Sequence, residues 1–127
     1  MVLVDTSAWI ITGGTLDGLL RHVPEEEIAT CPPIVQELLQ GTRGRDDYDL
    51  TRKMLLGMTV LDAPVPLVRY EEAAQLYLQC RDGGFTIRKA VDLLIAASAI
   101  AHRVTVLHRD RDFDYLAQVT GLQAIRI

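Results

Sequence analysis

Short runs of apolar residues alternate along the chain with longer stretches in which apolar positions recur every three or four residues. The run at residues 2–4 is continuous, which predicts a strand buried on both faces, as in a parallel sheet, and residues 105–107 predict a second strand. Residues 27–30, 58–61 and 122–127 predict three more short strands. We therefore expect a central, mostly parallel sheet of four to five strands.

The stretches between these strands predict helices, because their apolar residues fall on one face at helical spacing. After the Pro32-Pro33 pair, which suits the first turn of a helix, Ile34, Leu38 and Leu39 form one such face. The segment from residue 90 to 101 is apolar almost throughout, which is typical of a buried central helix. Helices are expected at residues 7–11, 16–22, 32–40, 46–56, 67–81, 89–102 and 113–119.

Strands and helices thus alternate along the whole chain, and this order is typical of α/β proteins with a parallel sheet. The length of 127 residues fits one domain, which we expect to span residues 1–127. Apolar residues make up 49% of the chain and charged residues 24%, which excludes disordered and collagen-like classes. The net charge of −4 argues against a protein that coats nucleic acid through bulk positive charge.

The remaining composition points to the cytoplasm. Cys31 and Cys80 show no zinc-binding spacing, and we expect them to be free thiols in a reducing compartment. The N-terminus lacks the basic region that precedes the apolar core of a signal peptide. No uncharged stretch approaches the ~18 residues of a membrane-spanning helix. We therefore expect a cytoplasmic protein without membrane association.

Three acidic residues stand where the predicted sheet would bring them together. Asp5 directly follows the first strand, and Asp110 comes soon after the strand at residues 105–107. Ligands of open α/β sheets bind in the crevice outside the carboxyl ends of the strands. Asp92 is the lone charge of its apolar helix, where an unpaired carboxylate would be very costly. These acids are therefore candidates for one shared site.

Each acidic candidate also has a simpler interpretation. Asp5 and Asp112 each precede a predicted helix and are suitable caps for it. Asp92 lies in a first turn, where an acid complements the helix dipole. Glu37 lies on the polar face of its helix, where exposure to solvent is the simplest interpretation. From the residues alone, both interpretations stay open.

If the acids do converge, their chemistry requires a cation. Carboxylates without matching basic partners repel one another, and some would have to be protonated unless a cation is present. Oxygen ligands of this kind suit Mg²⁺ or Mn²⁺, and Mg²⁺ also engages substrate phosphates. Such an ion activates water and stabilises the charge that develops in phosphodiester hydrolysis. The acids thus indicate a metal-dependent phosphate-ester enzyme and leave its substrate open.

Four blocks of the chain resemble the motifs of the PIN-domain ribonucleases, and most closely those of the VapC-type toxins of type II toxin–antitoxin systems. In chain order they are residues 4–10 (VDTSAWI), 33–38 (PIVQEL), 92–99 (DLLIAASA) and 108–113 (HRDRDF). Each block alone is a weak pattern, but together and in this order they cover essentially the whole chain. One departure is His108, where threonine is more usual, and it adds a titratable group beside the site.

The resemblance implies a three-layer α/β/α sandwich with a pocket of acids that hold one or two Mg²⁺ or Mn²⁺ ions. Asp5 and Asp92 carry over as direct metal ligands. Glu37 and Asp110 carry over as further ligands, some through water, or as water-positioning groups, and Asp112 as a secondary ligand. By this resemblance, the protein is an Mg²⁺-dependent endoribonuclease that uses an activated water to cleave single-stranded RNA.

The resemblance also implies partners. It predicts a homodimer and a cognate VapB-type antitoxin that occludes the pocket, commonly with an arginine among the acids. Such an insertion is physically sensible because a guanidinium forks onto carboxylates. The resemblance further implies that Thr6 or Ser7 contributes a hydroxyl to the pocket.

Two other functions are weighed against this hypothesis. The first is a PIN-like domain that binds a partner without catalysis, against which the complete set of acids argues. The second is a phospho-accepting signalling domain of similar length and fold, in which Asp62 would accept the phosphate. That fold needs an acid pair after the first strand and a lysine after the last strands, whereas Asp5 is alone and both lysines come earlier.

Basic residues adjoin three of the acidic blocks, and 11 of the 13 basic residues are arginines, which suit phosphate recognition. A solvated surface is the alternative interpretation for each of them. The five acids of the blocks are part of 17, so the rest of the chain holds 12 acids against 13 bases. The net negative charge is therefore compatible with RNA as a substrate. The flanking basic residues are Arg43, Arg45, Arg88, Lys89, Arg109 and Arg111.

Overall fold

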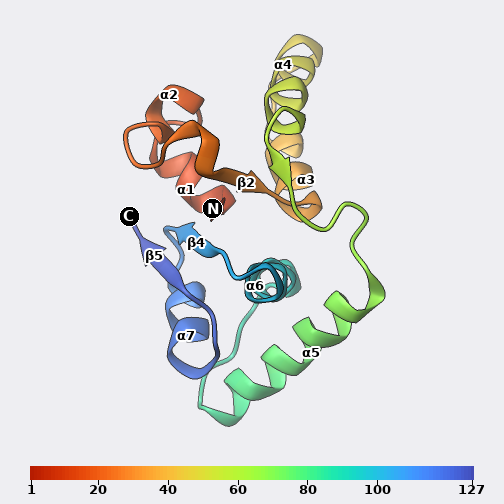
Figure 1. Ribbon diagram of the computed structural model, residues 1–127, viewed down its shortest axis with the longest axis vertical. Coiled ribbons are helices and arrows are strands. Elements are labelled where there is room, and N and C mark those ends of the chain that lie inside the picture. Colours follow the sequence, from red (N-terminus) through yellow and green to blue (C-terminus); the bar gives the residue numbers. More distant parts are fainter.

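Five short strands form one parallel sheet at the centre of the computed structural model, which describes residues 1–127 (Figure 1). The order across the sheet is β3-β2-β1-β4-β5, and every neighbouring pair is parallel. The predicted α/β class with a sheet of four to five strands is therefore confirmed. The strands are β1 (Val2–Val4), β2 (Ile28–Thr30), β3 (Thr59–Val60), β4 (Thr105–His108) and β5 (Ala124–Arg126).

The strands that follow β1 along the chain lie on both sides of it in the sheet. The place between β1 and β4 is therefore a topological switch point. β2 and β3 follow on one side of β1, and the chain then crosses over to place β4 and β5 on the other side. Val4 and Leu107 are register partners at this point, so β1 and β4 end next to each other. The crevice beyond such a pair of strand ends is where open α/β sheets bind ligands.

One face of the sheet is covered by the three helices that belong to the C-terminal half of the chain. Leu3 and Val106 point into this face and are fully buried in the larger hydrophobic core. The helices that close this core are α5 (Leu67–Asp82), α6 (Ala90–His102) and α7 (Arg111–Val119).

The opposite face carries the smaller core. Val4 and Leu107 point into it, because successive side chains of a strand face opposite sides of the sheet. This core is closed by α1 (Thr6–Ile11), α2 (Leu16–Leu19) and α4 (Arg45–Leu56). Together with the first face, this gives the three-layer α/β/α sandwich.

α6 is the buried central helix, as its composition predicts. Every residue from Asp92 to Ala99 is buried, and the helix packs between the sheet and α5 (Figure 1). None of the helices combines the length and the apolar character that crossing a lipid bilayer demands.

Apart from the end of α2, every predicted boundary lies within two residues of the boundary in the structure. The helix expected at residues 16–22 ends at Leu19, after which the N–H groups of His22 and Val23 both donate to the Leu19 carbonyl. A 3₁₀ turn, η1 (Glu25–Glu27), follows Pro24 and was not predicted, because three consecutive glutamates carry no apolar period. The last strand begins at residue 124 rather than 122. α3 (Pro32–Gln40) begins at the proline pair as predicted.

Candidate metal centre

Asp5 is fixed at the carboxyl end of β1 by the helix that follows it. The residue is 4% exposed, and its carboxylate accepts hydrogen bonds from the backbone N–H and the hydroxyl of Ser7, so it caps α1. The Ser7 hydroxyl in turn accepts from the backbone N–H of Arg109, 2.9 Å away. Ser7 thus links the end of β1 to the loop after β4. Asp5 therefore both caps α1 and belongs to the candidate site.

Asp92 enters the site from the first turn of α6. The residue is 2% exposed, and its Oδ2 atom has no hydrogen-bond partner. Its backbone N–H donates to the carbonyl of Lys89, the N-cap residue of this helix. The sequence therefore correctly marked Asp92 as a buried acid, and the structure adds that one of its oxygens is unsatisfied.

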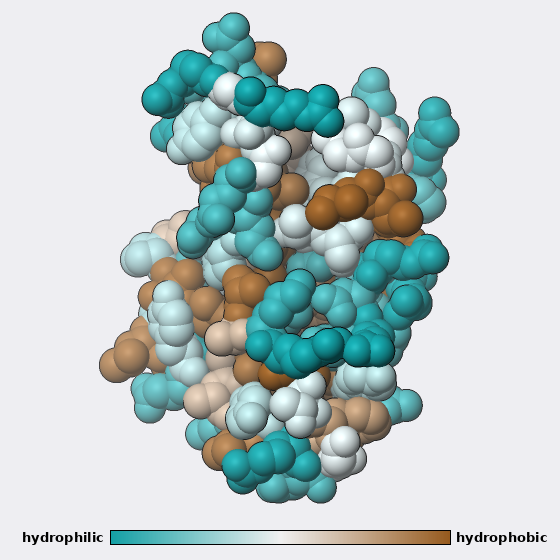
Figure 2. Space-filling view, turned by 180° about the vertical axis from the view of Figure 1, so that it is seen from behind, coloured by the Kyte–Doolittle hydropathy of each residue, from teal (hydrophilic) through white to brown (hydrophobic).

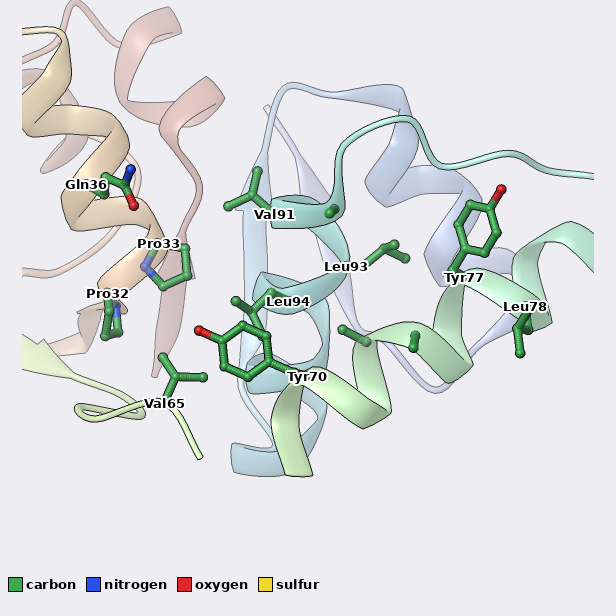
Figure 3. Close-up of a pocket in the computed structure, with 13 residues that line it drawn as sticks. Pro32, Pro33, Gln36, Val65, Tyr70, Tyr77, Leu78, Val91, Leu93 and Leu94 are labelled. Carbon is green, nitrogen blue, oxygen red and sulfur yellow. The ribbon is translucent and has the colours of Figure 1, made fainter. Parts of the chain in front are cut away.

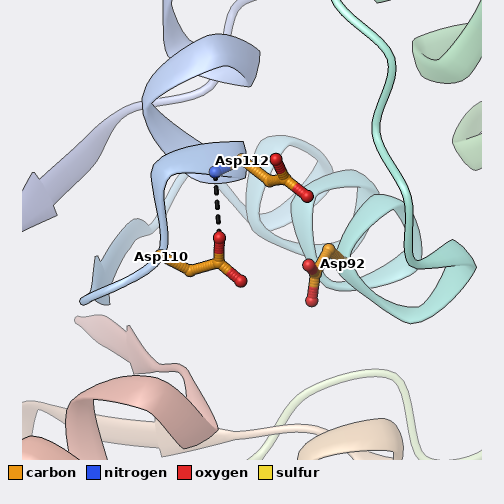
Figure 4. A group of neighbouring side chains, drawn as sticks. All are labelled: Asp92, Asp110 and Asp112. Atoms are coloured by element: carbon orange, nitrogen blue, oxygen red, sulfur yellow. Dashed lines mark hydrogen bonds between the residues drawn. The ribbon is translucent and has the colours of Figure 1, made fainter.

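Asp110 and Asp112 come from the loop and first turn after β4. Asp110 caps α7 by accepting the backbone N–H of Asp112 at 3.0 Å, and Asp112 is 3% exposed. Figure 4 shows these two carboxylates turned toward that of Asp92, and one oxygen from each of the three lies within 4.8 Å of the others. Asp112 therefore belongs to the most closely spaced group of acids.

Glu37 faces the same region from α3, on the other side of the crevice. It is half-buried, and its carboxylate accepts a hydrogen bond from the Thr6 hydroxyl at 3.1 Å. The solvent-exposed interpretation of Glu37 is therefore wrong. The helical pattern missed this contact because it depends on α1 packing against α3, which one helix alone does not reveal.

The charges of the other acids act on Asp92 and on Glu37. Burial raises the pKa of Asp92 to about 7, with further increases from Asp5, Asp110 and Glu37, while Lys89 opposes them. Burial and Asp5 also raise the pKa of Glu37. Asp5 and Glu37 lie outside the closest group, but their charges reach Asp92. The structure thus brings every predicted acid to one end of the sheet.

The donor set fits a hard divalent cation. Three carboxylates converge, and the unpaired Oδ2 of Asp92 is a buried ligand atom that no protein group satisfies. Mg²⁺ and Mn²⁺ take oxygen ligands of this kind, and their charge would offset the burial and the neighbouring acids that together raise the pKa of Asp92. The residues that could hold such an ion are Asp5, Asp92, Asp110 and Asp112.

His108 lies behind the acids and supports the loop that carries them. The residue is fully buried, and its Nδ1 atom accepts the backbone N–H of Asp110 at 3.1 Å. Its Nε2 atom lies 3.4 Å from Oδ1 of Asp114, and burial lowers the pKa of His108. The ring therefore holds the Asp110 loop in place and does not join the acidic cluster.

Asp62 lies in a different cluster, so the phospho-acceptor hypothesis is wrong. Its side chain is 5% exposed, and its oxygens accept hydrogen bonds from Arg69 and Ser98 and contact His102 at 2.8 Å. A carboxylate that is this enclosed and this fully bonded offers no free oxygen for phosphorylation. The cluster ties the loop after β3 to α5 and α6.

Two grooves lie against α3, the helix that carries Glu37. An apolar groove of about 660 Å³ runs between α3 on one side and α5 and α6 on the other, with Tyr70 and Tyr77 along it (Figure 3). A second groove of about 490 Å³ lies among α1, α3 and α4, and Thr6 and Glu37 are part of its wall.

The sequence matches the PIN domain family over residues 2–119. Two relatives from Mycobacterium tuberculosis are similar along much of their length. Ribonuclease VapC11 is 37% identical over 131 residues, which cover 98% of this chain and 97% of that protein. Ribonuclease VapC6 is 33% identical over 105 residues, which cover 81% of each.

Solved structures of related proteins share the fold. The crystal structure of VapBC-5 from Mycobacterium tuberculosis, described as a member of the VapBC family of toxin–antitoxin systems, has a TM-score of 0.70 at 25% identity. The match covers 98% of this chain and 97% of that one. DNA-bound VapBC from Salmonella typhimurium has a TM-score of 0.74 at 16% identity, covering 98% and 96%.

Proposed function

The chain belongs to the PIN domain family, among the VapC ribonucleases, and we propose that it is an Mg²⁺-dependent endoribonuclease toxin of the cytoplasm, formed by a single PIN domain over residues 1–127. The observation that carries this proposal is the unpaired buried Oδ2 of Asp92 beside the carboxylates of Asp110 and Asp112. A site built only for stability would not leave a buried carboxylate oxygen without a partner.

The acids divide the work according to their positions. Asp5, Asp92, Asp110 and Asp112 would hold the ion, and the Ser7 hydroxyl keeps the Asp5 carboxylate in place. Glu37 faces the group from α3, and its raised pKa suits it to take a proton from the attacking water. When bound, Mg²⁺ or Mn²⁺ makes that water more acidic and stabilises the negative charge that develops on the phosphate.

The direct test is RNA cleavage by the purified protein with Mg²⁺, with Mn²⁺ and with chelator. Substitution Asp5→Asn removes a ligand charge and is expected to reduce cleavage on the order of 10²-fold or more. Asp82→Asn is the matched control, because Asp82 is 77% exposed at the end of α5. Cleavage that persists in chelator would contradict the metal mechanism. A protein that binds Mn²⁺ but cleaves no RNA would instead support the catalytically inactive interaction domain.

A VapB-type antitoxin is the partner that fits the groove among α1, α3 and α4. Glu37 and Thr6 form part of this groove, so a segment bound there reaches the acids directly. One related solved structure is described as a member of the VapBC family of toxin–antitoxin systems, and another as DNA-bound VapBC. We expect an antitoxin segment with an arginine to lie here and to compete with the metal ion for the acids.

We also propose that the protein is a homodimer through the apolar groove beside α5. Leu67, Tyr70 and Leu78 of this helix are 75%, 52% and 46% exposed, which is unusual for large apolar side chains on one helix. Figure 2 shows apolar side chains exposed on the side of the molecule where α5 lies. A second copy would bury these side chains, and we expect it to leave the acidic end open for RNA.

A further inference from the structure

Lys89 occupies a position that the sequence blocks do not assign to the acidic site. It is the N-cap residue of α6, and its carbonyl accepts the backbone N–H of Asp92 at 3.1 Å. This bond fixes the backbone of Lys89 at the start of the helix that carries Asp92. Its side chain is 61% exposed, and its Nζ atom lies 3.7 Å from Oδ2 of Asp110. The ammonium therefore stands at the entrance to the acids.

The charge of Lys89 is shared by the whole acidic cluster. Among the described ion pairs, that of Lys89 with Asp110 is the one that brings a lysine or arginine to these acids. The pKa of Lys89 is raised by Asp92 above all, and further by Asp110, Glu37 and Asp5. Lys89 is thus the cation that these four carboxylates share within the chain.

The contact with Asp110 is poorly suited to a structural role. A separation of 3.7 Å with a mostly exposed lysine contributes little to stability, because water screens the pair and the side chain must be ordered. The ammonium sits on a flexible stem and can leave the acids at little cost. Such a group can pair with the acids in the metal-free protein and with a different partner once a metal ion is bound.

We propose that Lys89 is both the resident counter-ion of the acids and a ligand for the phosphate of the RNA. In the metal-free protein its ammonium balances part of the acidic charge. A divalent cation takes over that role and repels the ammonium, which then faces the phosphate at the mouth of the site. This inference rests on the proposed function for its second half, whereas its first half concerns the protein and the cation alone.

The two roles predict effects of opposite sign from one substitution. Lys89→Met removes a cation that competes with Mn²⁺, so the metal-free acids are expected to bind Mn²⁺ roughly 3- to 10-fold more tightly. The same substitution removes a phosphate ligand, so kcat/KM for a short oligoribonucleotide is expected to fall roughly 10- to 100-fold. A residue that only stabilised the fold would not tighten Mn²⁺ binding.

The experiment measures Mn²⁺ affinity by titration calorimetry without RNA, and then cleavage at saturating Mn²⁺. Lys89→Arg keeps the charge and is expected to bind Mn²⁺ like the wild type and to retain more of the activity than Lys89→Met. The control is Lys53→Met, since Lys53 is the one other lysine and lies exposed in the last turn of α4. Thermal melts in chelator check that each variant is folded.

Tighter Mn²⁺ binding together with slower cleavage in Lys89→Met, and neither effect in Lys53→Met, would support the inference. Unchanged or weaker Mn²⁺ binding in Lys89→Met would overturn it, as would the same loss of cleavage in both lysine variants. If the wild type binds Mn²⁺ but cleaves no RNA, the proposed function fails and the phosphate role fails with it. In that case the Mn²⁺ affinities still decide whether Lys89 is the counter-ion.

Discussion

At the scale of single residues, Asp92 carries the main energetic conflict of the site. Its carboxylate is buried with one oxygen unpaired, and burial, together with the neighbouring acids, raises its pKa to about 7. In the unfolded chain the carboxylate titrates near its ordinary value of 3.8. The ionised form is therefore disfavoured in the folded, metal-free protein. The buried carboxylate lowers the free energy of unfolding there, and it provides a metal ligand.

This conflict predicts how an Asp92→Asn variant behaves in chelator. Because the folded pKa lies above the unfolded one, the wild type loses stability as the pH rises from about 4 to about 7. The variant has no charge there, so it should exceed the wild type by roughly 2 kcal/mol in free energy of unfolding at pH 8. Urea unfolding measures this difference, which should shrink toward pH 4. A difference that instead grows toward acid pH would contradict the account.

The residue scale also shows what sequence reasoning reaches. It was predictable that Asp5 and Asp110 share a site, because strand ends meet at one edge of a parallel sheet. Asp92 could be added because a lone charge in an apolar helix must find a partner. Glu37 was not separable from a solvated acid, since its burial depends on the Thr6 hydroxyl of another helix. The support that His108 gives to the Asp110 loop was equally invisible, because it depends on the path of one loop.

At the scale of elements, two adjacent hydroxyl groups at the start of α1 orient two of the acids, one at the end of β1 and one on α3. Ser7 bonds to Asp5 within the same turn, and Thr6 reaches across to Glu37. The resemblance to the PIN-domain ribonucleases implied that Thr6 or Ser7 would contribute a hydroxyl to the site, and each of them contacts an acid. The start of α3 was easier to predict than η1, because a proline pair marks the former whereas three consecutive glutamates carry no apolar period.

Thr6→Val tests the junction with a side chain of nearly the same shape. The Thr6 hydroxyl lowers the pKa of Glu37 against the effects of burial and Asp5. Its loss should raise that pKa further, so more Glu37 is protonated and inactive at a given pH. We expect the acidic limb of the pH–rate profile to move to higher pH and the rate at a fixed pH on that limb to fall. An unshifted profile would show that Glu37 is not the proton acceptor.

A second feature at the scale of elements is the Asp62 cluster, which joins the loop after β3 to α5 and α6. Burial would raise the pKa of Asp62, but hydrogen bonds from Arg69, His102 and Ser98 lower it to about 2. Its ionised form therefore stabilises the fold above about pH 4, and this contribution is lost as the pH falls toward 2.

Asp62→Asn should accordingly lower the free energy of unfolding by about 2 kcal/mol at pH 7, with a smaller loss at pH 3. Chemical denaturation at both pH values measures the change. Glu72→Gln is the matched control, because Glu72 contacts the same arginine but is 35% exposed. Equal losses in the two variants would mean that the buried carboxylate has no special role.

At the scale of the whole molecule, charge and apolar surface lie in different places. The acids gather at the carboxyl end of the sheet, while the exposed apolar side chains of α5 border a separate groove. The net charge of −4 is thus largely the charge of one site that a divalent ion would neutralise. The arrangement leaves the molecule free to use one surface for assembly and another for catalysis.

Leu78→Glu tests the assembly surface. Leu78 is 46% exposed on α5, so the substitution should change the stability of the monomer little while placing a charge in the dimer interface. Light scattering after gel filtration should give about twice 14.1 kDa for the wild type and one copy for the variant. Leu50→Glu, on the exposed face of α4, should remain dimeric. A monomeric wild type would contradict the proposed homodimer.

The central claim is that the acids act by holding a divalent ion during RNA cleavage. It is tested most directly by following Mn²⁺ occupancy by electron paramagnetic resonance and the initial rate of RNA cleavage in the same titrated samples. We predict that rate and occupancy rise together in the wild type and that both are lost in Asp92→Asn. Cleavage without bound Mn²⁺, or full occupancy with full activity in Asp92→Asn, would contradict the account.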